Sequence, residues 1–109
     1  MSIFLSETEA PVEAIVHAIE YVAELVGIEH VGIGLDYAFD QEEIQALVRT
    51  HREQFVGASG FGGYDTLQFT EPEKLPLVTE ALLARGFGLR DVQAIMGGNF
   101  FRIAESVWP

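Results

Sequence analysis

The residue of this sequence best placed to do chemistry is Asp36, an acidic side chain that ends an apolar run. Residues 28–36 are nearly continuous apolar and glycine residues, which is typical of a strand that is covered on both faces. A carboxylate at the end of such a strand can bind an amine or transfer a proton. It can also accept a hydrogen bond from the backbone of the following turn. The residue pattern leaves both interpretations of Asp36 open.

Three histidines are the other candidates for chemistry. The spacing of His17, His30 and His51 from one another, and from Asp36 or Asp40, matches no compact zinc-binding pattern. We therefore expect no metal site within this chain, and we expect these histidines to be solvated or hydrogen-bonded.

Composition and charge exclude several classes of protein. The chain has 109 residues, 49% of them hydrophobic, and no cysteine, as expected for one small folded unit without disulfides. Residues 1–48 contain ten acids and no lysine or arginine, and such a surface repels nucleic acid. No apolar run approaches the roughly 20 residues that span a bilayer. We therefore expect a cytoplasmic chain that neither binds nucleic acid nor inserts into a membrane.

Helices are expected on both sides of the strand. Four apolar residues recur at helical spacing on one face of residues 11–26: Ile15, Ile19, Val22 and Val26. Gly27 follows as the expected C-terminal stop. Asp40 is placed to cap a second helix.

The second half of the sequence predicts a long loop and then three more helices. Residues 54–70 are rich in glycine and aromatic residues without periodicity, which indicates an irregular loop. A helix through Leu77, Leu82 and Leu83 should follow and stop at Gly86 or Gly88. After a short helix over 89–96, Gly97 and Gly98 should give a left-handed helix end, and Asn99 should cap the last helix.

Two ordered stretches of the sequence resemble the C-terminal part of the membrane (renal) dipeptidase family, zinc peptidases of the amidohydrolase-like superfamily. The stretches are AELVGIEHVGIGLDY and LLARGFGLRDVQAIMGGNFFRIAESVW. The matching residues are Gly32, Ile33, Gly34, Asp36 and Tyr37, followed by Gly86, Phe87, Asp91, Val92, Ile95, Gly97, Gly98, Asn99 and Arg102. Ala38 and Phe39 depart from the Asp-Gly that many members have after the aromatic residue. The resemblance covers nearly the whole chain.

The resemblance implies an α/β fold, the C-terminal portion of a TIM-type (β/α)8 metal-dependent hydrolase barrel. Residues 1–109 would form a single segment, the last third of the barrel, mostly helical with one strand at 28–36. Such a barrel needs about 200 to 400 residues, so the remaining strands would belong to polypeptide outside this chain. Barrel enzymes place catalytic residues at the C-terminal ends of strands, where Asp36 lies.

The same resemblance implies part of a zinc-dependent dipeptidase, which hydrolyses a dipeptide or similar amide with metal-activated water. Asp36 matches an aspartate beside the family's two zinc ions, where it takes part in substrate binding and proton transfer, and Tyr37 would line the substrate site. The family's zinc ligands precede the matched part. We therefore expect no zinc bound to this chain alone, and we expect the isolated chain to be inactive.

The alternative is a non-catalytic one: a truncated fragment or an interaction module that associates with itself. Helix faces without neighbours would favour association. We therefore expect either a homo-oligomer or binding to the missing N-terminal part of the enzyme, with a dipeptide as the substrate of the complete enzyme.

Overall fold

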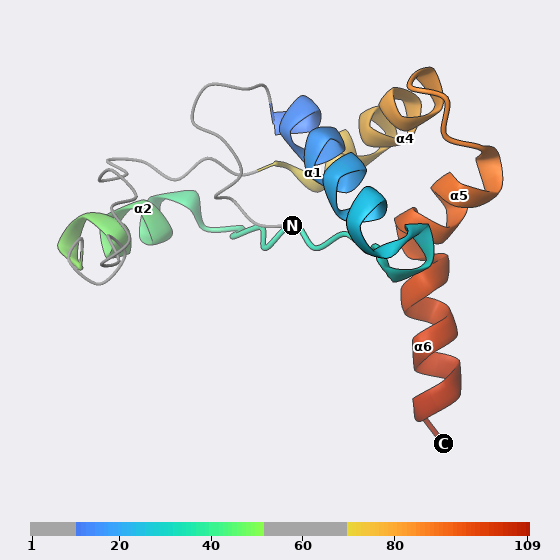
Figure 1. The fold of residues 1–109 in the computed structure, drawn as a ribbon. Coiled ribbons are helices and arrows are strands. Elements are labelled where there is room, and N and C mark those ends of the chain that lie inside the picture. The colour runs from blue at the N-terminus through green and yellow to red at the C-terminus, as the bar shows by residue number, and fades with distance from the viewer. Residues whose placement is uncertain (1–10, 52–69) are drawn as a thin grey trace.

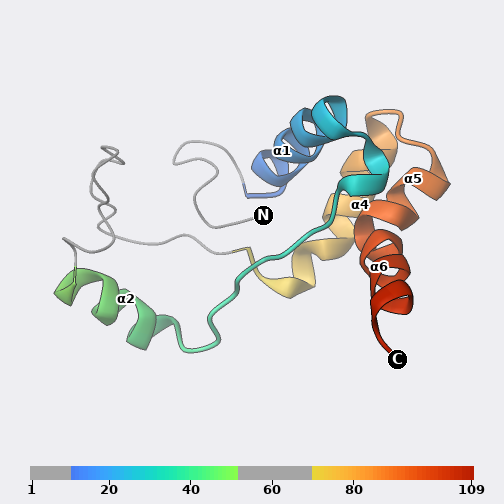
Figure 2. The ribbon, with the colours of Figure 1, turned by 60° about the horizontal axis from the view of Figure 1, so that its bottom comes forward.

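The computed structural model describes residues 11–51 and 70–109, and every regular element in these ranges is helical. In chain order the elements are α1 (Pro11–Val26), the 3-10 turn η1 (Ile28–His30), α2 (Gln41–Thr50), the 3-10 turn η2 (Pro72–Lys74), α4 (Leu75–Ala84), α5 (Leu89–Gln93), the π-helical turn η3 (Ala94–Gly98) and α6 (Asn99–Val107). Figures 1 and 2 show α1, α4 and α5 gathered together, with α6 extending from them and α2 lying apart. The loop expected at 54–70 lies, except for Thr70, outside the described residues.

The expected α/β barrel segment with a strand at residues 28–36 is wrong. Ile28–His30 form a 3-10 turn, and the extended residues that follow join no sheet within the described ranges. A strand is stable when its N–H and C=O groups pair with a neighbouring strand. Neither described range supplies one, so the apolar run forms an extended connection on a small helical unit.

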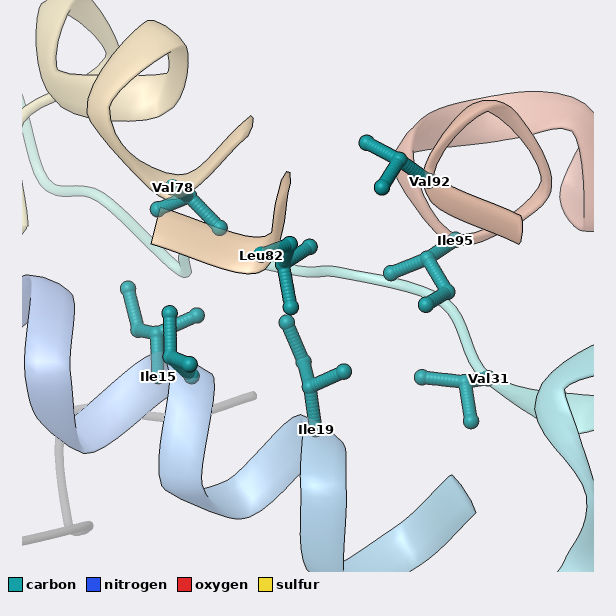
Figure 3. Close-up of a cluster of buried hydrophobic side chains, with 8 residues drawn as sticks. Ile15, Ile19, Val31, Val78, Leu82, Val92 and Ile95 are labelled. Carbon is teal, nitrogen blue, oxygen red and sulfur yellow. The ribbon is translucent and has the colours of Figure 1, made fainter. Parts of the chain in front are cut away.

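A core of eight buried side chains joins the helices to the beginning of this extended connection. Its members are Ile15, Val16, Ile19, Val31, Val78, Leu82, Val92 and Ile95. Figure 3 shows Ile15 and Ile19 of α1 facing Val78 and Leu82 of α4. Each fully buried aliphatic side chain contributes about 1.5–3 kcal/mol, so these contacts hold α1, α4 and α5 together.

Glycines end the two helices of this core, as the sequence predicts. Gly27 follows α1 with a φ of 95°, and its N–H donates to the carbonyl of Ala23. Gly86 follows α4 with a φ of 93°. There the N–H of Phe87 donates to the Leu82 carbonyl and that of Gly86 to the Leu83 carbonyl, which is a Schellman motif. Both positions need the left-handed backbone that glycine adopts without strain.

The inward face predicted for α1 is only partly correct. Ile15 and Ile19 are buried, and Val22 is half-buried against the core, but Val26 is exposed. In α4, Leu82 is buried whereas Leu77 and Leu83 are exposed. No helix within residues 11–51 and 70–109 is long and apolar enough to cross a membrane.

Candidate functional site at Asp36

Asp36 lies on the extended connection between η1 and α2, with its side chain exposed. Within the described part of the chain, Asp36 is the non-glycine residue with a positive φ, at 53°. Aspartate tolerates this left-handed conformation better than most residues. No hydrogen bond or ion pair joins its carboxylate to another described residue. The carboxylate is therefore accessible to a ligand.

The connection that leads to Asp36 has the side-chain alternation of a strand. Val31 is buried in the core, and Ile33 and Leu35 pack against it. Gly32 faces the other way, where a Cβ atom would come within 2.4 Å of the Phe100 ring. The ring therefore packs directly on the backbone of Gly32, and a side chain at this position would displace it. The segment therefore has the two-residue period of a strand, although the strand was predicted from the nearly continuous apolar and glycine run and not from this alternation.

Asn99 holds the beginning of the connection. Its side chain is 5% exposed, and Nδ2 donates to the carbonyls of Ile28 (2.7 Å) and Val31 (2.8 Å). The amide oxygen of Asn99, Oδ1, accepts a hydrogen bond from Arg102 Nη1 at 2.9 Å. Arg102 Nη2 also donates to the Glu29 carbonyl at 2.7 Å. The first turn of α6 thus binds the carbonyls of residues 28, 29 and 31.

These contacts correct two predictions for the glycine–asparagine segment. Asn99 is the first residue of α6 and does not cap that helix with its side chain, which instead contacts a segment about 70 residues earlier. Neither glycine adopts a left-handed conformation, since φ is 167° at Gly97 and −59° at Gly98. The chain passes from the π-helical turn into α6 with a kink at Gly97.

Two further candidate residues follow Asp36 in the sequence, Tyr37 and Asp40. Tyr37, the expected substrate-binding residue, is half-buried, and its ring packs edge-to-face on Phe39 with 5.2 Å between ring centroids. Asp40 caps α2 as predicted, because its Oδ1 accepts from the N–H of Glu43 at 2.9 Å. The two carboxylates therefore differ: Asp40 caps a helix, whereas Asp36 makes no such contact with residues 11–51 or 70–109.

The structure does not bring the three histidines together. His17 is on α1, His30 is 3.6 Å from Glu29, and the His51 ring lies 3.2 Å from the carbonyl of Leu47 in α2. Across the described ranges, no three His, Asp or Glu side chains are grouped so that they could hold a metal ion. The described residues around Asp36 thus do not fit the two-zinc centre that the resemblance implies.

A second polar cluster, not predicted from the sequence, joins α1 to α4. Arg85 donates from Nη1 to Glu20 (2.8 Å) and from Nη2 to Glu13 (2.7 Å), and Nη2 lies 3.0 Å from His17 Nε2. The hydrogen bonds to Glu20 and then Glu13 raise the pKa of Arg85. The helical spacing of Glu13, His17 and Glu20 was visible in the sequence, but nothing there indicated an arginine 65 residues from Glu20 as their partner.

The chemistry available at this site is that of a single exposed carboxylate on a connection anchored at its beginning. A carboxylate binds an ammonium group through charge-assisted hydrogen bonds, and it can accept a proton. No protein family model, no curated protein and no solved structure matches this chain.

Proposed function

We propose that this chain is part of a zinc-dependent dipeptidase, in which Asp36 binds the free amino group of the dipeptide and transfers a proton. The proposal rests on the resemblance of two sequence stretches to the dipeptidase family. The observation that supports it most is the contact between these stretches. Asn99 and Arg102, from the second stretch, bind the carbonyls of residues 28, 29 and 31 in the first.

The zinc ions belong, in this proposal, to polypeptide outside the described residues. They would supply the activated water of the hydrolysis. The described residues contain no group of ligands that fits them. The isolated chain is therefore expected to be inactive, and activity is expected when it associates with the polypeptide that carries the zinc ligands.

The environment of Asp36 suits this role. Its carboxylate is exposed and makes no ion pair with a described residue, so a substrate ammonium would not displace a partner in residues 11–51 or 70–109. Opposite charges at hydrogen-bond distance attract more strongly once water is excluded between them. Tyr37 follows directly in sequence and would line the substrate site.

Co-expression with the zinc-binding N-terminal portion of a dipeptidase from the resembled family tests the proposal. The expected result is release of free amino acids from a dipeptide only when both parts are present, and loss of this hydrolysis with a metal chelator. The Asp36→Asn variant should lower kcat by about 100-fold or more, as for loss of a proton-transferring group. Its circular dichroism spectrum should not change.

The matched control is Glu24→Gln, which neutralises an exposed carboxylate on α1. Hydrolysis with Glu24→Gln should equal that of the unaltered chain. Normal hydrolysis with Asp36→Asn, or no hydrolysis from the two parts together, would contradict the proposal.

A second function, that of a non-catalytic module that associates with itself, is favoured by a different observation. Apolar side chains along α6, among them Phe101 and Val107, are exposed. Metal analysis of the purified chain examines both proposals. Stoichiometric zinc in the isolated chain would show that it contains a zinc site of its own, contrary to both.

A further inference from the structure

The helix α6 presents apolar side chains to solvent along its length. Phe101, Ile103 and Val107 are each more than half exposed, and Trp108, which follows the helix, is 74% exposed. Figure 1 shows α6 extending away from α1 and α4. A helix of nine residues is marginal in water without tertiary contacts. A surface that covers these side chains would therefore stabilise α6.

The exposed side chains surround a shallow hollow of about 520 Å³, lined by Phe100, Phe101, Ile103, Ala104, Val107 and Trp108. All of these residues are apolar. Sites for small molecules combine an apolar lining with a few polar groups that orient the ligand, and this lining has no polar side chain. The hollow therefore suits the apolar side chains of another helix better than a small molecule.

The distribution of charge is compatible with a second copy of the chain. The chain has a formal net charge of −11, so two copies repel each other over most of their surface. Residues 99–109 contain one arginine and one glutamate, and Arg102 is already bound to Asn99 and the Glu29 carbonyl. The apolar positions 100, 103, 104 and 107 recur at helical spacing and form an uncharged stripe. Two copies can meet at this helix with little repulsion.

The exposed area is also close to what a dimer needs. Phe100, Phe101 and Trp108 are 59%, 66% and 74% exposed. Since an aromatic side chain buries about 150–250 Å², these three offer roughly 400 Å² per copy. Ile103 and Val107 add to this area, so two copies would bury about 1,000 Å² in total, which is the lower limit for a specific interface.

We infer that α6 is the interface of a homodimer, in which the α6 helices of two copies pack against each other about a two-fold axis. The same stripe would face itself across that axis, as in other isologous interfaces. This inference names the contact surface of the self-associating module and rests on that second proposed function. It does not depend on zinc or hydrolysis.

Sedimentation velocity and the fluorescence of Trp108, the only tryptophan of the chain, test the interface together. Between about 1 and about 200 µM, where an interface of minimum size associates, the chain should change from monomer to dimer. The Trp108 emission should shift to shorter wavelength over the same range, because dimerisation buries the indole. Ile103→Glu, which places a charge on the stripe, should remain monomeric with unshifted emission.

The matched control is Phe39→Ser, which removes an 87% exposed aromatic ring from the connection before α2. It should dimerise like the unaltered chain. A monomer at all concentrations, as expected if a different polypeptide covers α6, would overturn the inference. So would dimerisation that Ile103→Glu leaves unchanged, or that Phe39→Ser weakens equally. Circular dichroism identifies any loss of helix in Ile103→Glu, and Val107→Glu then provides a second substitution on the same stripe.

Discussion

The connection between η1 and α2 is held at its beginning and exposed at Asp36. Val31 is 1% exposed, and its carbonyl accepts a hydrogen bond from the buried Asn99. Five residues later, Asp36 is exposed in a left-handed conformation, without an ion pair to a described residue. The contacts with the helical unit are therefore concentrated at the beginning of the connection, around Val31. The carboxylate is left available.

The largest expected effect comes from removing the contact at the base. Asn99→Ala leaves the carbonyl of Val31 without its Asn99 donor, whereas the Ile28 carbonyl keeps the N–H of Val31. An unsatisfied buried group costs about 1–3 kcal/mol. We expect the free energy of unfolding to fall by about 1–3 kcal/mol in urea denaturation. Gln93→Ala, an exposed position nearby, should change it by less than about 0.5 kcal/mol. Equal, small effects of both substitutions would show that the base is not held in this way.

A smaller effect is expected from crowding the other face of the connection. In Gly32→Ala the new Cβ meets the Phe100 ring, which must move. Because the ring is 59% exposed and can turn toward solvent, the cost should be about 1 kcal/mol, the lower end of the range for overpacking. At Gly88 the nearest atom to an added Cβ is 3.7 Å away, so Gly88→Ala serves as the control and should be tolerated.

Combining Gly32→Ala with Phe100→Ala tests whether the Phe100 ring causes the loss of stability. If the ring is the obstacle, Gly32→Ala should cost little in a chain that already carries Phe100→Ala, as measured by a double-mutant cycle. A cost of Gly32→Ala that is independent of Phe100 would contradict the contact.

The smallest effect on stability is expected at the free end. Asparagine tolerates the left-handed conformation as aspartate does, so Asp36→Asn should change the free energy of unfolding by less than about 0.5 kcal/mol. Asp36→Ala should cost about 1 kcal/mol, because alanine disfavours this backbone conformation. A large loss in Asp36→Asn would show that the carboxylate supports the fold, contrary to the comparison.

Features that depend on nearby residues were predictable from the sequence. The apolar spacing of Ile15 and Ile19 predicted α1, and Gly27 and Gly86 end α1 and α4 as expected. The capping of α2 by Asp40 was also predicted. Each of these depends on contacts within a few residues, which a sequence pattern contains.

Features that depend on distant residues were not predictable. The nearly continuous apolar and glycine run of residues 28–36 predicted a strand, but a strand also needs a partner, and the described ranges contain none. Asn99 was expected to cap α6 because asparagine often does so. Its actual partners are the carbonyls of Ile28 and Val31, 71 and 68 residues away. Only the folded arrangement of α1, η3 and α6 brings them together.

Amide hydrogen exchange at Val31 and Asp36 tests the central comparison most directly. The N–H of Val31 donates to the Ile28 carbonyl at 3.1 Å within the core, so it should exchange at least about tenfold more slowly than that of Asp36. In Asn99→Ala the exchange at Val31 should accelerate, while that at Asp36 stays fast. Equal rates at the two amides in the unaltered chain, or no change at Val31 in Asn99→Ala, would contradict the account.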